Sequence, residues 1–345
     1  MKVIGSGLRK FSRSQLLWPC VGLCVVLLFD LIFLPGFFVV QVKNGYLYGR
    51  LIDIVNNAAT LMILSIGMTL VIATGGTDIS VGSIVAVSGA IVAQMLGSGL
   101  SAQTPFIFCI LAALAVSTLL GCWNGVLVAV VGVSPMVATL ILNVAGRGIA
   151  QLITGGQIPT VSYQPFCLIA SYMPGMPVPF SVLIVAAMFL LIRLFTRKTS
   201  FGMFVEAVGI NSKASRYSGI NAVGITFLVY VISGFCAGVG GLITASIIKA
   251  ADANNAGYLI EMDAILAVAL GGTKMTGGKF SIGASMVGAL IIQSLTTTLY
   301  AWGVQPQVLP VVKSLVVIVI CLIQSEEFRT IVSGFGKTER KRIHA

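Results

Sequence analysis

The chain has 345 residues, of which 57% are hydrophobic and only 9% are charged, and its mean hydropathy is +1.03. Soluble globular domains carry about 25% charged residues, so this composition excludes an ordinary soluble domain. Apolar stretches of about 20 residues are typical of helices that cross a bilayer, and they recur along this chain. The composition therefore predicts an all-α, polytopic membrane protein. The formal net charge of +11 is expected to come from basic loops on one membrane face, not from a nucleic-acid-binding surface.

The first apolar stretch, residues 16–40, follows a basic segment that holds Lys2, Arg9, Lys10 and Arg13. A secretory signal peptide has a shorter apolar region and small residues at its cleavage site. This stretch is therefore predicted to be an anchored helix, and residues 1–15 to be a cytoplasmic segment.

About ten membrane-spanning helices are predicted in one transmembrane domain, 1–345. They lie near residues 16–40, 53–74, 79–97, 105–131, 134–154, 177–195, 223–247, 259–272, 281–300 and 306–324. An even number places both termini on one side of the membrane. With the N-terminus inside, sixteen basic residues fall in inside segments, whereas only Lys43, Arg50 and Lys249 fall outside. Because basic residues accumulate in cytoplasmic loops, both termini, including the basic tail 326–345, are predicted to be cytoplasmic.

Two loops are long enough to be informative. The outside loop 155–176 contains no Lys, Arg, Asp or Glu and is too short to be a folded domain, so capture of a dilute solute would need a separate protein. The inside loop 196–222 contains "EAVGINSKASRYSGI". One interpretation is a solvated connector, and the other is a short helix that lies across the inside face and docks on a soluble partner.

The stretch "TGGTDISVG", Thr74 to Gly82, interrupts two apolar runs. Glycines end helices readily, and Asp or Ser side chains cap the next helix, which indicates a tight turn near the inside face. Exposed backbone at such a break can also line a solute path. A similar "GGTKMTGG" follows at 271–278, and a shared way of ending helices explains it as well as an internal repeat does.

Polar residues in or beside the spans are expected to face the bundle or a wet cavity, since a charge at bilayer depth is costly. Pairing between helices is the favoured interpretation for most of them, and Arg147 is a candidate to neutralise one of the acids. These residues are Asp30, Asp53, Asn56, Asn57, Asn124, Asn143, Arg147, Gln151, Glu261, Asp263, Gln293 and Lys313.

Several chemistries lack the residues that they need. The tail sequence "SGFGKT" resembles a phosphate loop, but Ile331 stands where that motif requires its first glycine. The cysteines have no metal-ligand spacing, and the single histidine, His344, lies in the tail. No catalytic residue, no metal site and no cofactor bound by this chain are therefore expected. An ATP-driven transporter subunit and an ion-driven secondary transporter both remain open, whereas a membrane enzyme is disfavoured.

Five stretches resemble the permease subunits of bacterial ABC importers for monosaccharides, the ribose/galactose/xylose group. They are "GMTLVIATGGTDISVGS" (67–83), "GCWNGVLVA" (121–129), "SPMVATL" (134–140), "GMFVEAVGINSKASRYSGI" (202–220) and "MDAILAVALGGTKMTGG" (262–278). Within the family, residues 138–158 and 251–268 are most similar to galactofuranose importer permeases. Thr77, Ile79 and Lys274 depart mildly from the family pattern, which bears on the substrate and not on the family.

This resemblance implies a type II importer-like permease in the bacterial inner membrane, working as a homo- or heterodimer. It implies two cytoplasmic ATPases, which bind ATP and Mg, and a periplasmic sugar-binding protein. It also implies that residues 206–219 form the coupling helix that contacts the ATPase, with these residues in that role: Glu206, Ala207, Val208, Gly209, Asn211, Arg216 and Gly219.

Two further sets are predicted from residue types. Amide and aromatic side chains suit a sugar path, and with the break near Asp78 they give the pathway or gate set: Asn56, Asn57, Gly75, Gly76, Asp78, Trp123, Asn124, Asn143 and Gln151. Charged residues in outside segments give the set that docks the binding protein: Lys43, Arg50 and Asp252.

Overall fold

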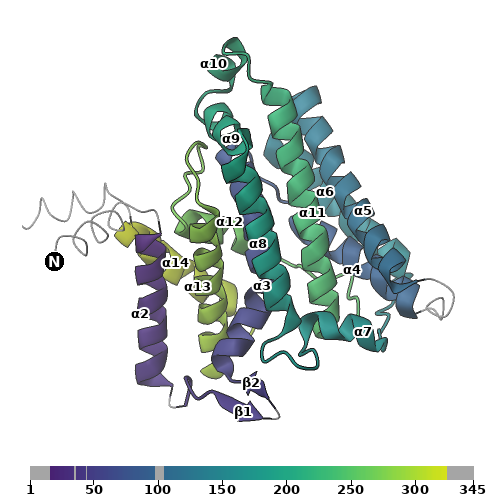
Figure 1. The fold of residues 1–345 in the computed structure, drawn as a ribbon, viewed down its shortest axis with the longest axis vertical. Helices are drawn as coiled ribbons and strands as arrows, with labels where there is room; N and C mark the ends of the chain where they lie inside the picture. The colour runs from purple at the N-terminus through teal and green to yellow at the C-terminus, as the bar shows by residue number, and fades with distance from the viewer. Residues whose placement is uncertain (1–15, 35, 44, 98–104, 325–345) are drawn as a thin grey trace, which may run out of the picture.

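The computed structural model describes residues 16–34, 36–43, 45–97 and 105–324. Long helices run roughly side by side and form a bundle, with a two-stranded hairpin at one end and two short helices at the other (Figure 1). Each of the ten predicted stretches overlaps one α-helix. The helices are α2 (Leu17–Phe33), α3 (Arg50–Ala73), α4 (Val81–Gly97), α5 (Phe106–Gly125), α6 (Pro135–Thr154), α8 (Phe180–Lys198), α11 (Ala222–Ile248), α12 (Ile260–Leu270), α13 (Ile282–Ala301) and α14 (Leu309–Gln324).

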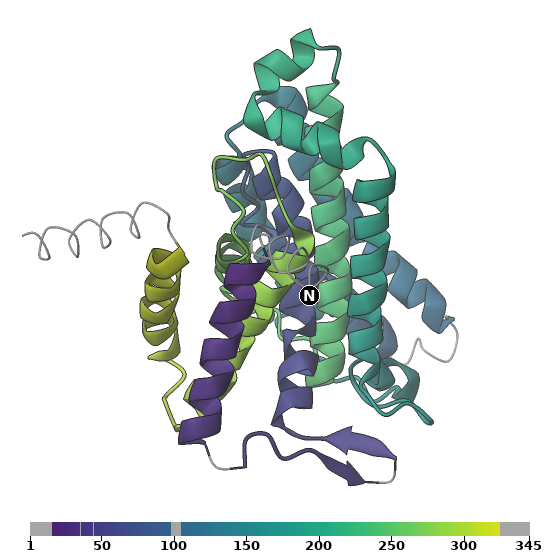
Figure 2. The same ribbon diagram turned by 60° about the vertical axis from the view of Figure 1, so that its left-hand side comes forward.

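Six helices in the described part of the chain are long and apolar enough to cross a membrane. They are Arg50–Ala73, Phe106–Val131, Pro135–Thr154, Phe180–Lys198, Ala222–Ile248 and Ile282–Ala301. The second combines α5 with a π-helical end, η2 (Val126–Val131). Helices α2 and α4 are apolar but shorter, with 17 residues each. Helices α2 and α14 lie together at one side of the bundle (Figure 2).

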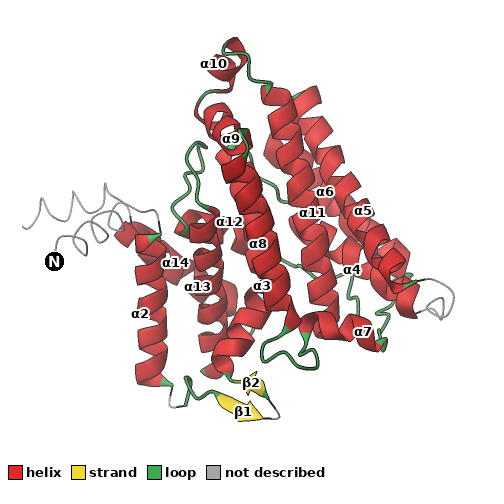
Figure 3. Ribbon diagram, viewed as in Figure 1, coloured by secondary structure: helices red, strands yellow, loops and turns green. Residues whose placement is uncertain are grey.

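Short elements connect the helices at both ends (Figure 3). Strands β1 (Gln41–Lys43) and β2 (Tyr46–Tyr48) pair antiparallel, with Val42 opposite Leu47. Helix α7 (Gln164–Cys167) and the 3-10 turn η3 (Leu168–Ala170) lie at the same end. Helices α9 (Phe201–Ile210) and α10 (Ser212–Tyr217) form the opposite end.

The prediction of a helix through Val40 is wrong. Helix α2 ends at Phe33, and Leu34 leaves the helical region with φ −122° and ψ 89°. Leu34 precedes a proline in the sequence, and the proline ring disfavours helical backbone at the preceding residue. Gly36 then turns the chain at φ +79°, and the apolar residues that follow lead into β1. The strict all-α prediction therefore missed a hairpin.

Helix α3 forms the centre of the bundle. Every residue from Ala58 to Ala73 is buried, and the helix contacts α8, α11, α12 and α13. A helix that is apolar on all sides is expected to be enclosed by others. Glycines let its neighbours approach closely: on α5 and α11, a Cβ atom at Gly121 would lie 2.9 Å from the Cα atom of Gly234.

Helix α12 is shorter than the stretch 259–272 that was predicted to cross the membrane. Its 11 residues rise about 16 Å, about half of a 30 Å hydrocarbon layer. The preceding residues 249–259 are not helical. A hydrogen bond from the amide of Val161 to the carbonyl of Lys249 (2.8 Å) holds the start of this loop near α7. A full-length helix is therefore replaced by a loop followed by half a helix.

Candidate functional site

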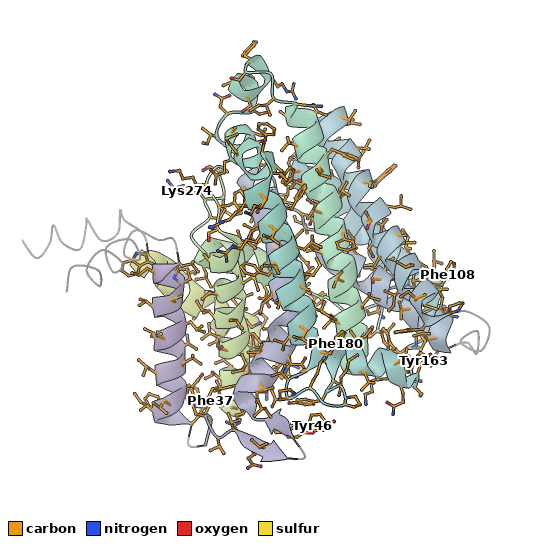
Figure 4. The ribbon with its side chains drawn as sticks, in the orientation of Figure 1. Phe37, Tyr46, Phe108, Tyr163, Phe180 and Lys274 are labelled. Carbon is orange, nitrogen blue, oxygen red and sulfur yellow. The ribbon has the colours of Figure 1, made fainter. Side chains whose placement is uncertain are left out.

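The two ends of the bundle carry different side chains. We call one the α10 end, made of α9, α10 and residues 74–80 and 271–281, and the other the hairpin end, made of β1, β2, α7 and residues 171–179. Lys274 lies toward the α10 end, whereas Phe37, Tyr46 and Phe180 lie toward the hairpin end (Figure 4).

The loop between α3 and α4 is organised around Asp78, which is fully buried. Its Oδ1 atom accepts hydrogen bonds from the backbone amide of Ser80 (3.1 Å) and from the Ser80 hydroxyl (2.6 Å). Its Oδ2 atom accepts from the hydroxyl of Ser233 on α11 (2.7 Å). Hydrogen bonds to a carboxylate are stronger than those between neutral groups. These bonds agree with the predicted role of Asp78 in holding the loop, and they add an anchor to α11.

Two more side chains close the loop around Asp78. The Asn124 amide on α5 donates to the Ser80 hydroxyl (2.7 Å), and the Tyr230 hydroxyl on α11 donates to the carbonyl of Thr77 (3.3 Å). Asn124, Ser80 and Tyr230 are all fully buried. In this conformation the carboxylate of Asp78 is therefore enclosed by protein, and its contacts are structural.

Three glycine-containing segments meet beside this loop, and we call their meeting point the glycine junction, made of Ala73, Gly75, Gly209, Gly277 and Gly278. The amide of Gly278 donates to the carbonyl of Ala73 (2.9 Å). A Cβ atom at Gly209 would lie 1.8 Å from that carbonyl oxygen and 2.6 Å from the amide nitrogen of Gly278. A Cβ atom at Gly277 would lie within 3.1 Å of backbone atoms of Gly209, Gly75 and Ala73. The end of α3, α9 and the α12–α13 loop therefore touch through their backbones, and no side chain fits between them.

The segment 206–219, predicted to be a single coupling helix, contains two helices instead. Asn211 is extended (φ −159°, ψ 99°) and separates α9 from α10. Its side chain accepts a hydrogen bond from the amide of Ala214 (3.0 Å), so it caps α10 and competes with continuation of α9.

The predicted coupling residues divide between the two helices and their flanks. Val208 is buried and Gly209 faces the glycine junction. Asn211, Arg216 and Gly219 are exposed, with Gly219 at φ +83°. Glu206 and Ala207 are partly buried. One side of this segment therefore packs on the bundle, and the α10 side is open to a partner.

The non-helical loop 249–259 is held by α6. The guanidinium of Arg147 donates hydrogen bonds to the carbonyls of Ala253 and Asn254 (3.3 Å each) and of Ala256. Gln151, one turn further along α6, donates to the Asn254 side chain (2.5 Å). Since Arg147 lies well inside α6, the loop runs beside the interior of that helix. Backbone of this kind is tolerated at membrane depth only where protein or a wet cavity surrounds it.

The start of α12 packs against the start of α4. A Cβ atom at Gly82 would lie 2.3 Å from Oε2 of Glu261 and 2.5 Å from the carbonyl of Gly257. Glu261 is buried, and its Oε2 atom has no hydrogen-bond partner within the described residues. Arg147 forms no salt bridge with it, so the predicted neutralisation of an acid is a longer-range attraction. Asp263 instead pairs with Lys313 (3.0 Å).

The nine predicted pathway residues do not form one site. Gly75, Gly76, Asp78 and Asn124 gather at the α3–α4 loop, and Gln151 joins loop 249–259. Asn56 accepts from the Ser181 hydroxyl and donates to the carbonyl of Ala170 (3.1 Å), so it ties α3 to α8 and η3. Asn57, Trp123 and Asn143 lie elsewhere. The first two are exposed, and Asn143 is partly buried, with an Oδ1 atom that has no hydrogen-bond partner in the described part of the chain.

The three predicted docking residues occupy the hairpin-end side of the chain. Lys43 ends β1 opposite Tyr46, and the Arg50 guanidinium lies 5.8 Å from the centre of the Phe37 ring. Asp252 accepts hydrogen bonds from the backbone amides of Asn254 (3.0 Å) and Asn255 (3.1 Å) and from the Asn255 side chain (2.7 Å). Partial burial alone would raise the pKa of Asp252, but these bonds and the nearby Arg147 outweigh it and lower that pKa.

Sequence reasoning identified only some of the residues that organise the site. It included Ser80 among the possible helix caps but not as a partner of Asp78, although Ser80 follows Asp78 by two positions, the spacing of a local turn bond. Ser233, Tyr230 and Gly277 come from distant segments, and their amino-acid types carry no signal of these contacts.

Comparisons with known proteins give a consistent picture. A family model described as a branched-chain amino acid transport system / permease component matches residues 50–323. The chain is 46% identical over 334 residues to the galactofuranose transporter permease protein YtfT of Escherichia coli strain K12, covering 95% of this chain and 96% of that protein. It is 39% identical over 344 residues to the fructose import permease protein FruF of Bifidobacterium longum, covering 98% and 95%. It is 32% identical over 327 residues to the ribose import permease protein RbsC of E. coli K12, covering 93% and 98%. No solved structure matches the chain.

Proposed function

Because the chain belongs to the permease family of these transport systems, we propose that it is the membrane-spanning subunit of an ATP-driven importer of a monosaccharide, and that the sugar is galactofuranose. The observation that carries this proposal is near-full-length similarity to three permeases whose names specify sugars. The sugar itself is chosen from the most similar of the three, the galactofuranose permease. The chain performs no bond chemistry, since hydrolysis of ATP belongs to separate ATPase subunits.

We further propose that the whole chain is one multi-pass domain of the bacterial inner membrane with ten passages and both termini in the cytoplasm. The basic residues of inside segments support this orientation, which puts the α10 end in the cytoplasm and the hairpin end in the periplasm. The assembly contains a second permease chain, identical or related, two ATPases below and a sugar-binding protein above. Lys43, Arg50 and Asp252 then face the binding protein, and exposed Asn211, Arg216 and Gly219 face the ATPase.

The glycine junction suggests how force from the ATPase reaches the pathway. A partner that moves α10 moves α9, and Gly209 then acts directly on the carbonyl of Ala73 and the amide of Gly278. Because interdigitated backbones resist compression, the displacement passes to the Asp78 loop and to the α12–α13 loop together. Both loops join helices that enclose the centre of the bundle, so a small shift at α9 can switch the pathway between two openings.

Residues 253–256, the part of loop 249–259 that Arg147 and Gln151 hold, are the proposed pathway wall at membrane depth. Half-helices and unwound backbone supply polar groups to solutes in other transporters, and here α12 and its preceding loop have that form. Gln151 and Asn254 place amides on the same surface. A neutral sugar needs hydrogen-bonding groups, and the amides and backbone of this wall supply them.

An ion-driven transporter is the competing function, and the buried acids Asp30 and Asp78 would be its carriers. Each accepts a short hydrogen bond from a hydroxyl, Thr298 to Asp30 (2.6 Å) and Ser80 to Asp78. This partnering explains Asp78 as a structural anchor, whereas the buried Oδ2 atom of Asp30 has no hydrogen-bond partner within the described residues. Asp30 is therefore the acid that an ion-driven function would use.

Uptake into proteoliposomes tests the proposal. The permease is reconstituted with its ATPase, with ATP inside and the binding protein outside, and labelled galactofuranose, galactopyranose, fructose and ribose are compared. ATP-dependent uptake with a preference for galactofuranose is expected, and no uptake by the permease alone under a proton or sodium gradient. Gradient-driven uptake by the chain alone would overturn the transport class, whereas ATP-driven uptake of another sugar would overturn only the substrate.

A further inference from the structure

A cavity of about 440 Å³ opens at the α10 end between α8, α9 and the start of α13. Its walls include Arg193, Arg197, Phe189, Phe280 and Gly283. None of the residues assigned to the pathway or to binding-protein docking lines it.

The cavity has an excess of positive charge. Arg193 and Arg197 lie one turn apart near the end of α8, and both are exposed. The guanidinium of Arg193 rests 5.3 Å from the centre of the Phe189 ring. Glu206 is the one acid in the lining. Within the described residues neither arginine has a carboxylate within salt-bridge distance, since the ion pair found there joins Lys313 and Asp263.

Two helix N-termini add to this positive potential. Gly202 and Met203 belong to the first turn of α9, and Ile282 and Gly283 belong to the first turn of α13, and all four line the cavity. First-turn amides have no partner within their own helix, and the helix dipole favours anions at this end. Arginines together with helix N-termini are suited to a phosphate group.

The cavity also has apolar walls. Phe189, Phe280 and Leu16 form part of its wall. The same helix, α8, also exposes Leu190 (55%), Leu191 (56%) and Leu194 (46%). A ligand with a phosphate at one end and hydrocarbon chains at the other matches this arrangement. Its phosphate would lie in the charged part of the cavity, and its chains would lie along α8 in the bilayer. A free phosphate ion would use only the charged part.

We propose that this cavity binds the head group of an anionic phospholipid of the inner leaflet, with its phosphate between Arg193 and Arg197. The site goes beyond the transported sugar and does not depend on its identity, but its membrane depth rests on the orientation proposed above. Because Gly202 and Met203 belong to α9, the bound lipid braces the helix that carries Gly209. The lipid therefore sets the position from which the ATPase moves the glycine junction.

Native mass spectrometry of the full-length permease tests the site directly. The protein is released from bilayers of phosphatidylcholine mixed with phosphatidylglycerol, and retained lipid is quantified for the wild type and for the double variant Arg193→Gln/Arg197→Gln. We assign to each of the two arginines at the lipid phosphate about 1 kcal/mol of anionic-lipid binding, or about fivefold. Retention of phosphatidylglycerol is expected to fall about 25-fold in the double variant, with phosphatidylcholine unchanged.

Lys198→Gln is the matched control, because Lys198 ends the same helix and does not line the cavity. It removes one charge from the same end and is expected to retain lipid as the wild type does. Thermal unfolding of every variant in detergent verifies that the bundle has formed. A second arm offers soluble glycerol 3-phosphate and inorganic phosphate to the delipidated protein. Equal retention in all variants, an equal loss in Lys198→Gln, or tight binding of the soluble phosphates without lipid would each overturn the proposal.

Discussion

Gly209 and Ala73 are in direct backbone contact, so closely that a methyl group on Gly209 would lie 1.8 Å from the Ala73 carbonyl oxygen. Gly209 belongs to α9 at the cytoplasmic face of the proposed importer, and Ala73 is the last residue of the central helix α3. The contact joins α9, which the proposed mechanism moves through α10, to the most deeply buried helix without an intervening side chain. This contact is the basis of the coupling mechanism proposed above.

Alanine at Gly277 is expected to disturb the glycine junction, and alanine at Gly272 supplies the matched control. Both glycines lie in the α12–α13 loop with positive φ, +90° and +77°, so both variants incur backbone strain. Only at Gly277 does the new methyl group meet backbone atoms, whereas nothing lies within 4 Å at Gly272. Overpacking costs about 1–3 kcal/mol, so Gly277→Ala should lower the unfolding free energy by about that much more than Gly272→Ala. Equal losses in thermal unfolding experiments would show that the junction is not tightly packed.

Removal of the Ser233 hydroxyl is expected to weaken the anchor between the Asp78 loop and α11. A hydrogen bond to a charged group contributes about 1.5–3 kcal/mol, and Ser233→Ala should destabilise the protein by about that amount. Ser117→Ala is the control, because the Ser117 hydroxyl is also buried but donates only to the carbonyl of Ala113 in its own helix (2.8 Å).

A double-mutant cycle between Ser233→Ala and Asp78→Asn measures the same anchor directly. We expect the two substitutions to be non-additive, because Asp78→Asn removes the charge that strengthens this bond and Ser233→Ala removes its donor. Additive losses in unfolding free energy would contradict the assignment of Asp78 as the partner of Ser233.

Arg147 is expected to be needed for the shape of loop 249–259. Arg147→Gln leaves the carbonyls of Ala253, Asn254 and Ala256 without their charged donor, and sugar transport should fall about tenfold or more, corresponding to the loss of about 1.4 kcal/mol or more. Arg147→Lys keeps the charge but loses the planar donor group, so an intermediate rate is expected. Initial uptake rates at saturating binding protein provide the measurement. A lysine variant as impaired as the glutamine variant would show that geometry and not charge holds the loop, and an unimpaired glutamine variant would remove Arg147 from the pathway wall.

The charge of Asp252 is expected to persist from about pH 8 to about pH 5. Its pKa in the folded protein lies below the ordinary aspartate value of 3.8, so its hydrogen bonds stabilise the folded state above the unfolded pKa. That contribution is lost as the pH falls through the lower, folded pKa. The difference in melting temperature between wild type and Asp252→Asn should therefore stay constant from about pH 8 to pH 5 and shrink only below about pH 4. A difference that disappears near pH 6 would mean that another group controls this turn.

The positions of the helices were largely predictable because each apolar run is long and bounded by polar or glycine-rich segments. The predicted stretch 53–74, for example, becomes α3 at Arg50–Ala73. The hairpin at 41–48 was not predictable in this way, because its strands have three residues each and adjoin the apolar run of α2. The short length of α12 was also not predictable from the sequence. Residues 250–256 are mostly small, and small residues fit a buried loop as well as a helix.

The candidate site was predicted in part. The "TGGTDISVG" stretch identified Asp78 and its glycines because a polar break between apolar runs requires caps and left-handed turns. Its partner Ser233 comes from a helix far along the chain, and one buried serine in α11 looks like any other in the sequence. Gly209 entered the prediction as a contact with a partner, whereas the structure places it against Ala73. Packing between distant backbones leaves no local pattern, so the glycine junction became visible only in three dimensions.

The most direct test of the central claim is the ATPase activity of the assembled permease–ATPase complex in lipid discs, with and without sugar-loaded binding protein. Three permeases are compared: the wild type, Gly209→Ala, and Gly148→Ala, whose added methyl group meets nothing within 4 Å. We predict that loaded binding protein stimulates the wild type and Gly148→Ala, and that Gly209→Ala still assembles with the ATPase but is not stimulated. Wild-type stimulation in assembled Gly209→Ala complexes would contradict coupling through Ala73, and a wild type that recruits no ATPase would contradict the importer itself.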